Sequence, residues 1–522
     1  MKPLRTKAGK GNSESFYSLS FYIYLYFLAT MNVFSRFRLK QLFYKPYLFL
    51  FGTALFIRFP FFFRDYIDHD ESTFILIGKS ITDGHLPYDF LWDLKPPLLF
   101  YVFALVEWLF PHSLIAIRFF GVLIIFISAV VLMLIAKTIG AKNGFLIGLS
   151  YIIMSSLFGS MQGVMSEHVA VFFFLPALLL FLKNKAFINL LLSGILFGSA
   201  LLCKLNFAYT LLALFLYYFI FYYRSVGPRL IIKNISITTV GLTIPFVLIA
   251  IPYILQNKLS LFIESVFMAT LEYGHKTNIT AINKLSATAW IIAISLFFVV
   301  LAIFFVDKGN KKKAGMFVTL LISTLFTFYS SGTVNGHYLI QIFPFIAVLF
   351  LGFTLKHELK FFNYLKTTLL ILLISVESYL EYYRIIKQYS ENSTFYNGRA
   401  FISVNELKKL NLENKKIFFA DHHIGYWFLN KYPLTKSVTH PSSLSRPAFF
   451  KHFGDTRTSL GELKYIMEEI KPEVIISRRE NLSFFTEDSP ENLYFESVMK
   501  KDFTTVYSNP KENIFIMQKK EN

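Results

Sequence analysis

Eleven stretches of mostly apolar residues run through the first three quarters of this chain, and they constrain its fold more than any other feature. A transmembrane helix needs about 20 such residues, and only helices or closed barrels can satisfy the backbone within lipid. With 54% hydrophobic and 16% charged residues, the composition fits a bilayer-embedded body. The predicted spans are 46–63, 114–137, 143–161, 168–182, 186–203, 206–223, 234–255, 286–306, 315–332, 338–355 and 367–384.

A further apolar stretch, residues 98–110, is too short for a span and contains Glu107. At that length a helix lying along the membrane interface is favoured. With this segment placed at the interface, most Lys and Arg residues fall in alternate loops, which the positive-inside rule assigns to the cytoplasm. Residues 64–113 and the C-terminus then lie outside. The net charge of +19 is thereby explained by anionic lipid headgroups, and we expect no nucleic-acid partner.

Three regions follow from these patterns. Residues 1–45 form a cytoplasmic or leader segment, whose first part we expect to be dispensable. Residues 46–384 form a transmembrane domain with a first outer loop at 64–113, and residues 385–522 form a non-cytoplasmic soluble domain. The predicted fold class is an all-α polytopic membrane protein of about 11 transmembrane helices with interfacial helices, followed by a mixed α/β domain.

The last region differs from the rest because charges become frequent in it. Short apolar runs at 417–420 and 474–476 predict strands, and residues 463–470 have a helical pattern. The only cysteine, Cys203, excludes an intrachain disulfide.

Two outer segments have the apolar periodicity of interfacial helices. Residues 71–83 have one apolar face, with Asp70 or Ser72 as the expected N-cap and Gly84 after the last turn. Residues 259–272 have a second such face. Residues 259–272 belong to the loop 257–285, which could close over an outer site through Glu272, His275 and Lys276.

The first outer loop has the highest density of chemically active side chains. Asp70 and Glu71 open the helix 71–83, where the helix dipole favours an ionised carboxylate. Such a carboxylate suits a general base that takes a proton from a hydroxyl or an amine. Lys95 supplies a cation just before the interfacial helix 98–110.

Other polar residues are expected at the same membrane face. Glu167 begins a span from the outside, and Arg118 lies in the outer turns of another, where it needs an anion such as Asp93 or a lipid phosphate. The substrate contacts we predict are Tyr88, Asp93, His275, His337 and Tyr338.

The triplet Asp421-His422-His423 follows a predicted strand. It resembles a metal motif of phosphoesterases, but no matching Asp or His motif accompanies it. We therefore interpret it as a polar strand end.

An outward-facing site limits the chemistry, since nucleotide-activated sugars and ATP are cytoplasmic. A polyprenyl-phosphate sugar fits, because Lys95 and Arg118 would neutralise its departing phosphate. The sequence contains no Walker A pattern and no glycine-rich dinucleotide loop.

One order of residues resembles a known family. It runs Asp70-Glu71, Tyr88, Asp93-Leu94-Lys95-Pro96-Pro97-Leu98 and Arg118. This order is similar to the membrane glycosyltransferases of the protein O-mannosyltransferase and aminoarabinose lipid A transferase family (glycosyltransferase family 39-like), which have the GT-C architecture. The likeness extends to about Phe181 and is weaker across the middle spans, where His337-Tyr338 followed by Pro344 is similar to a late family element.

The resemblance implies roles for individual residues. Asp70 becomes the catalytic aspartate with Glu71 and Glu167 as supporting acids, and Lys95 meets the donor phosphate. It also implies inversion at the anomeric carbon and no required cofactor, although the acids would permit a divalent metal. Leu94 stands where the aminoarabinose branch has an acid, which argues against lipid A as the acceptor.

The leading interpretation is an inverting glycosyltransferase that moves a sugar from a polyprenyl-phosphate donor to an envelope lipid, glycan or protein, on the outer face of the cell membrane. Two alternatives remain open. One is a transporter or flippase of lipid-linked sugars, for which Arg58 and Glu377 are the interior ionisable groups. The other is an outer-leaflet glycan polymerase or ligase.

Overall fold

The computed structural model describes residues 46–183, 185–274, 281–331, 334–354, 376–455, 457–478 and 481–521. Residues 53–522 form one compact unit, and residues 1–52 form another, of which 46–52 are described. The predicted leader therefore lies outside the described residues, as do His275 and Lys276.

Seven helices in the described part of the chain are long and apolar enough to cross a membrane. They are α3 with η1 (Pro46–Arg58, Phe59–Phe63), α6 (Leu114–Ile139), α8 (Ser166–Lys183), α10 (Phe207–Val226), α11 (Pro228–Leu255), α14 (Ala281–Phe305) and η4 with α15 (Lys308–Asn310, Lys311–Ser331). Each coincides with a predicted span, so the protein is an integral membrane protein by the length and composition of its helices.

Three predicted spans form shorter apolar helices. These are α7 (Gly144–Met154), α9 (Phe187–Leu201) and α16 with η6 (Phe343–Ala347, Val348–Thr354). Helix α7 ends where Ser155 and Ser156 follow, and both serines are completely buried. Broken helices are tolerated at membrane depth where protein surrounds them. The last predicted span, 367–384, begins outside the described residues.

Helices α9 and α11 pack at very short range because glycines face one another. A Cβ on Gly194 would overlap the carbonyl oxygen of Thr238, and one on Gly241 would overlap that of Leu191. Gly198, four residues after Gly194, meets Leu242 in the same way. Small residues spaced four apart are the usual device for close helix approach in membranes.

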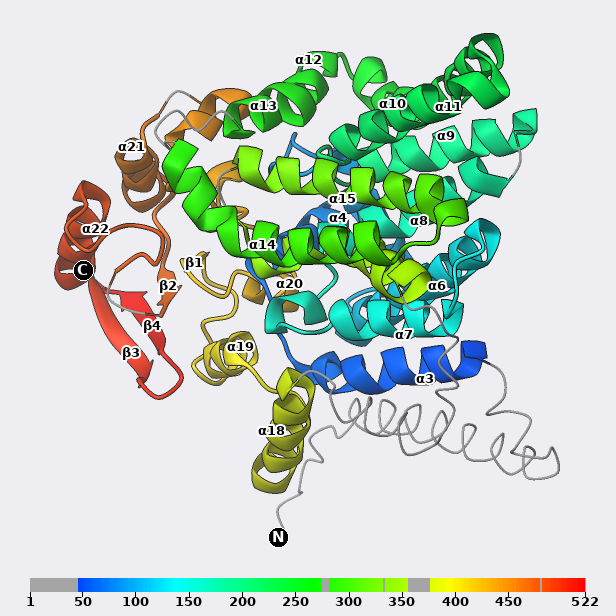
Figure 1. Cartoon of the computed structure of the whole chain (residues 1–522). Coiled ribbons are helices and arrows are strands. Elements are labelled where there is room, and N and C mark those ends of the chain that lie inside the picture. The colour runs from blue at the N-terminus through cyan, green and yellow to red at the C-terminus, as the bar shows by residue number, and fades with distance from the viewer. Residues whose placement is uncertain are drawn as a thin grey trace, which may run out of the picture. The chain divides into compact units, whose positions relative to one another are not determined.

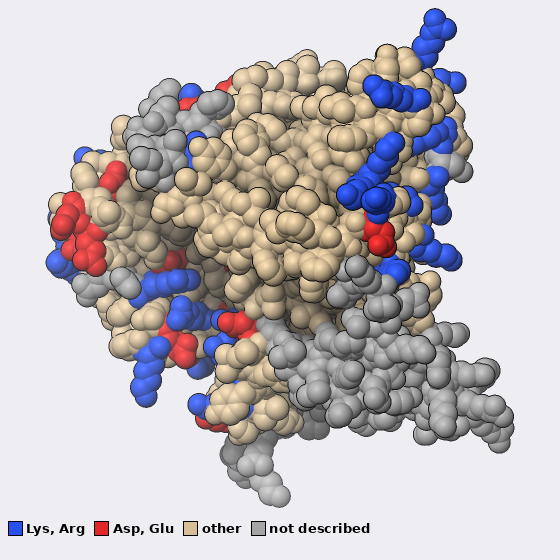
Figure 2. Space-filling view, viewed as in Figure 1, with Lys and Arg blue, Asp and Glu red and all other residues tan. Residues whose placement is uncertain are grey.

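The basic loops lie at one end of the helices. Lys313 Nζ donates to the carbonyl oxygen of Ile139 at 2.7 Å, and Tyr217 Oη donates to that of Lys312 at 2.6 Å. These contacts place the end of α6, the middle of α10 and the start of α15 together. Figure 2 shows Lys and Arg gathered over the helix ends at one edge, with an uncharged surface between them and the charged C-terminal part.

The first outer loop forms two helices that pack against each other, α4 (His69–Thr82) and α5 (Pro97–Leu109). Helix α4 begins earlier than predicted, because Asp68 and not Asp70 or Ser72 is the N-cap, and its carboxylate accepts from Asp70 N. Helix α5 exposes Trp108 and Leu109, as expected of an interfacial helix.

The second predicted interfacial helix is also present. It consists of α12 (Leu259–Ile263), η3 (Glu264–Met268) and α13 (Ala269–Gly274). The short turns η2 (Gly159–Gln162) and η5 (Gly336–Gln341) precede α8 and α16.

The C-terminal region contains a four-stranded sheet in the order β1-β2-β4-β3, drawn at one side of Figure 1. Strand β1 (Ile417–Phe419) pairs in parallel with β2 (Val474–Ser477), while β4 (Ile514–Lys519) pairs antiparallel with β2 and with β3 (Phe503–Asn509). The helices are α18 (Val376–Asn392), α19 (Arg399–Lys409), α20 (Gly425–Phe428), η7 (Lys436–Val438), η8 (Pro447–Phe453), α21 (Ser459–Lys464), η9 (Tyr465–Ile470) and α22 (Pro490–Asp502).

This C-terminal region packs on the first outer loop. Trp427 Nε1 donates to Glu107 Oε2 at 3.2 Å, so the one acid of helix α5 is buried with a partner. At the other end of the loop, Asp65 Oδ2 accepts from Phe401 N at 2.9 Å. The outer loop is therefore covered by residues more than 300 positions away.

The glycine packing of α9 and α11 is testable. Gly194→Ala should lower the free energy of unfolding of the detergent-solubilised protein by about 1–3 kcal/mol, because overpacking costs about that much. The higher helix propensity of alanine acts in the opposite direction. The measurement is the melting temperature of the purified variant. Gly309→Ala is the matched control, because nothing lies within 4 Å of the position of its Cβ. Equal melting temperatures for both variants would contradict the close packing.

Candidate functional site

Asp70 and Lys95 form the centre of the site. Asp70 lies in the first turn of α4, and Lys95 lies in the loop that leads to α5. Lys95 Nζ is 3.0 Å from Asp70 Oδ2, and their side chains are 20% and 17% exposed. The two groups are therefore in direct contact, and both are largely buried.

Electrostatics keeps this pair charged. Burial works to raise the pKa of Asp70, but the Lys95 ammonium and a hydrogen bond from His440 outweigh it and hold that pKa well below its usual range. Burial likewise works to lower the pKa of Lys95, but Asp70 and Asp93 raise it well above its usual value. Asp70 is thus a carboxylate at neutral pH and can accept a proton.

The loop between the two helices positions Lys95. Tyr88 has a left-handed backbone, with φ of 69°, and its hydroxyl donates to the carbonyl oxygen of Lys95 at 2.7 Å. Asp93 is buried, and its Oδ2 has no hydrogen-bond partner within the described part of the protein. Tyr88 therefore supports Lys95 through the backbone, and Asp93 does so through its charge.

Arg118 does not join this pair. Its guanidinium forms an ion pair with Glu71 Oε1, and both side chains are about 1% exposed. Glu71 also accepts from Val164 N at 2.6 Å. The sequence left two anions open for Arg118, a carboxylate such as Asp93 or a lipid phosphate. In the structure its partner is the carboxylate of Glu71.

Arg58, the transporter candidate, lies in the same buried region. It donates to the carbonyl oxygens of Met161, Gln162 and Gly163 at 2.5–2.8 Å. All three of its acceptors are backbone groups, which suits a fixed structural role.

A second polar cluster surrounds Glu167. Its carboxylate is buried and pairs with Lys204, and His337 Nε2 lies 4.0 Å from Glu167 Oε1. Lys204 Nζ stands 4.4 Å from the centre of the Tyr338 ring. Charge interactions with Asp70 and Lys95 reach His337, so this cluster adjoins the central pair. Lys204 is a residue whose place here the sequence analysis did not predict.

Histidines from the C-terminal region complete the surroundings. His440 Nε2 is 3.2 Å from Asp70 Oδ1, and His423 Nε2 is 3.0 Å from the Thr73 hydroxyl. The His423 ring is stacked on His69, with ring centres 5.7 Å apart. The triplet Asp421-His422-His423 follows strand β1 and is buried, and its last residue, His423, contacts helix α4. No signal in the sequence pointed to His440.

No group of three or more His, Cys, Asp or Glu residues within the described ranges is arranged to hold a metal ion. The histidine rings make their contacts with hydroxyls, a carboxylate and other rings.

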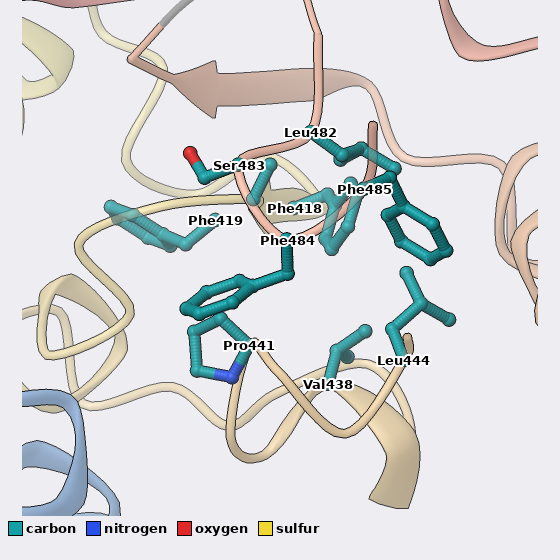
Figure 3. Close-up of a pocket in the computed structure, with 10 residues that line it drawn as sticks. Phe418, Phe419, Val438, Pro441, Leu444, Leu482, Ser483, Phe484 and Phe485 are labelled. Atoms are coloured by element: carbon teal, nitrogen blue, oxygen red, sulfur yellow. The ribbon is translucent and has the colours of Figure 1, made fainter. Parts of the chain in front are cut away.

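A small cavity of about 10 Å³ lies in the C-terminal region (Figure 3). Pro441, next to His440, lines it, and so does Phe484, whose ring contacts His69. The only polar side chain among its lining residues is that of Ser483, whose hydroxyl donates to Asp421. The cavity is therefore apolar.

The segment that the sequence analysis proposed as a lid contacts the C-terminal region. His452 lies between Glu264 and Glu272, with each ring nitrogen 2.7 Å from a carboxylate oxygen. Lys451 also pairs with Glu272 at 2.7 Å. Glu272 therefore ties the segment to the C-terminal region and does not face Asp70.

The Glu71–Arg118 pair yields a prediction. Arg118→Met should destabilise the solubilised protein by about 3–5 kcal/mol, because Glu71 would remain buried without its counter-ion. The double variant Glu71→Leu, Arg118→Met should recover most of that loss, as judged by melting temperature. A double variant as unstable as the single one would contradict a purely structural pair. A stable but inactive double variant would restore the predicted phosphate-binding role of Arg118.

The buried histidines predict a loss of stability in acid. Burial lowers the pKa of His69 to about 3 and that of His423 well below its usual value. Between pH 3 and the ordinary value of about 6.5, the unfolded chain binds protons that the folded protein does not. Stability should therefore fall as pH falls through that window, by up to about 1.4 kcal/mol per pH unit for each histidine.

Asp68 has the opposite effect on the pH dependence of stability, because burial and the charge of Asp70 raise its pKa to about 7. The folded protein therefore binds a proton at Asp68 before the unfolded chain does as pH falls. The test is therefore a comparison of variants between about pH 7.5 and about pH 5 by thermal unfolding. His69→Gln should lose less stability on acidification than the wild type. His85→Gln, outside this cluster, should retain the wild-type slope. An unchanged slope in His69→Gln would contradict the prediction.

No protein-family model matches the chain, and no curated protein matches it. A search of solved structures finds the archaeal oligosaccharyltransferase AglB from Archaeoglobus fulgidus, in complex with an inhibitory peptide and a dolichol-phosphate. The two chains are 11% identical with a TM-score of 0.44, and the match covers 92% of this chain and 74% of AglB.

Proposed function

We propose that this protein is a membrane glycosyltransferase that uses a polyprenyl-phosphate sugar as donor. The observation that carries the proposal is the contact between Asp70 and Lys95, 3.0 Å apart, at the helix ends opposite the basic loops. A base and a cation side by side meet the two needs of glycosyl transfer, which are a deprotonated acceptor and a stabilised leaving group.

The reaction divides between these two residues. The Asp70 carboxylate takes a proton from a hydroxyl or amine of the acceptor, which then attacks the anomeric carbon of the donor. The bond between that carbon and the phosphate oxygen breaks, and the electron pair leaves with the polyprenyl phosphate. Lys95 neutralises the departing phosphate, and attack from the face opposite the phosphate inverts the anomeric configuration.

The low pKa of Asp70 means that the carboxyl is ionised at neutral pH despite its burial, but it also makes the carboxylate a weak base while Lys95 holds it. When the donor phosphate approaches, Lys95 can shift one N–H toward it, which releases part of its hold on Asp70. The base then becomes more basic as the leaving group is stabilised.

The second cluster extends the same site. Lys204 and His337 lie close to the buried Glu167 and near Tyr338, within reach of the charges of Asp70 and Lys95. We assign Glu167 to holding Lys204, which supplies a second cation for the donor. Arg118 is left out of the donor site, because its side chain is about 1% exposed, whereas that of Lys204 is 11% exposed.

The orientation of the helices in the membrane completes the proposal. The basic loops at the far helix ends face the cytoplasm under the positive-inside rule, so the Asp70 site faces the outside of the cell membrane. The acceptor is then an envelope lipid, glycan or protein.

Asp70→Asn is the direct test. It should reduce sugar transfer at least about 100-fold, since asparagine has the same shape but cannot take a proton. Membrane vesicles with wild-type or variant protein would receive a panel of radiolabelled polyprenyl-phosphate sugars, and transfer to the endogenous acceptor and release of polyprenyl phosphate would be measured.

Asp89→Asn is the matched control, because Asp89 lies in the same loop but forms an exposed pair with Lys258. Protein level is followed by immunoblot. Wild-type transfer by Asp70→Asn would rule out the proposed base. Movement of labelled lipid across the vesicle without transfer would favour a flippase.

A further inference from the structure

The catalytic site is not confined to the transmembrane domain, because His440 contacts the carboxylate of Asp70 from 370 residues further along the chain. His440 Nε2 lies 3.2 Å from Asp70 Oδ1, while Lys95 occupies the other oxygen, Oδ2. The His440 side chain is 12% exposed. Lys95 and His440 thus contact the two oxygens of the Asp70 carboxylate from different directions and fix its orientation.

The protonation of His440 follows from its other contacts. The backbone N–H of Ser442 donates to His440 Nδ1 at 3.2 Å, and the Ser442 hydroxyl lies 2.8 Å from the same nitrogen. A backbone N–H can only donate, so Nδ1 is the acceptor and the ring proton is on Nε2. His440 therefore donates to Asp70 through Nε2–H.

The segment that contains His440 is anchored on both sides. Thr439 accepts from Trp92 N at 3.4 Å through its hydroxyl, and its carbonyl oxygen accepts from the Thr73 hydroxyl at 3.4 Å. Ser437 is bonded back to Glu462 of the C-terminal region at 2.7 Å. The ring of His440 also lies 5.8 Å from that of His69. The contact with Asp70 is thus part of a docked surface.

We infer that His440 is a positioning residue for the proposed base, so that the C-terminal region completes the active site of the transmembrane domain. This inference rests on the proposed function. His440 holds Oδ1 of Asp70 while Lys95 holds Oδ2, which leaves the remaining lone pairs of the carboxylate aimed at the acceptor. Because both nitrogens of His440 are engaged, His440 is not itself the base.

The test replaces the His440 ring in two ways, by a side chain that lacks a hydrogen-bond donor and by one that has such a donor. His440→Ala should lower kcat/KM about 10-fold to 100-fold, as expected for a lost hydrogen bond to a charged group. The acid limb of the pH–rate profile should move to higher pH, because a carboxylate that loses a donor becomes easier to protonate. His440→Gln should recover most of the activity and the wild-type acid limb, since its amide keeps an N–H.

The outcomes separate this inference from the proposed function. If Asp70→Asn is inactive but His440→Ala has the wild-type rate and pH profile, only the role of His440 is overturned. If Asp70→Asn is active, the proposed function falls first. A purely structural role would lower the melting temperature and rate of His440→Ala without moving the acid limb, and would overturn the inference as well. His85→Gln is the control for histidine loss.

Discussion

An ion pair between two mostly buried side chains, Asp70 and Lys95, sets the requirements for everything around it. Either charge alone would lose too much hydration energy to remain ionised in this position. Their mutual contact at 3.0 Å solves that problem only if the loop between α4 and α5 folds back far enough to return Lys95 to the start of α4. The left-handed Tyr88 and its bond to the Lys95 carbonyl are how the chain achieves that return.

Asp70 and Glu71 are neighbours in sequence, yet helix geometry separates their tasks. Successive residues of a helix point about 100° apart, so Asp70 meets Lys95 at the accessible edge while Glu71 points inward to Arg118. The inner pair joins α4 to α6, and Val164 N bonds the same carboxylate. The Asp70–Lys95 pair thus lies beside a buried ion pair that fixes α4 against α6.

The sequence predicts elements that depend on local pattern, such as helices. It does not predict which side chains pair when the partners are far apart in the chain. Apolar length and periodicity predicted the long helices. Charge density in one loop singled out Asp70 and Lys95, which are in contact in the structure, while their roles in catalysis stay a prediction. The sequence left either a carboxylate such as Asp93 or a lipid phosphate as the anion of Arg118. The fold supplies Glu71, because α4 and α6 are neighbours only in space. Nothing in a lone histidine identifies His440 as a contact of Asp70, since 370 residues separate the two.

The C-terminal residues that pack on the first outer loop strengthen the ion pairs beneath them by excluding water. Interactions between charges weaken steeply as water replaces protein around them. Trp427 buries Glu107, and His423 and His440 occupy the volume beside Thr73 and Asp70. If these groups were absent, water would reach the Asp70–Lys95 pair and reduce its effect on either pKa. The C-terminal region therefore acts on the Asp70–Lys95 pair twice, once through the hydrogen bond of His440 and once by excluding solvent from the two charges.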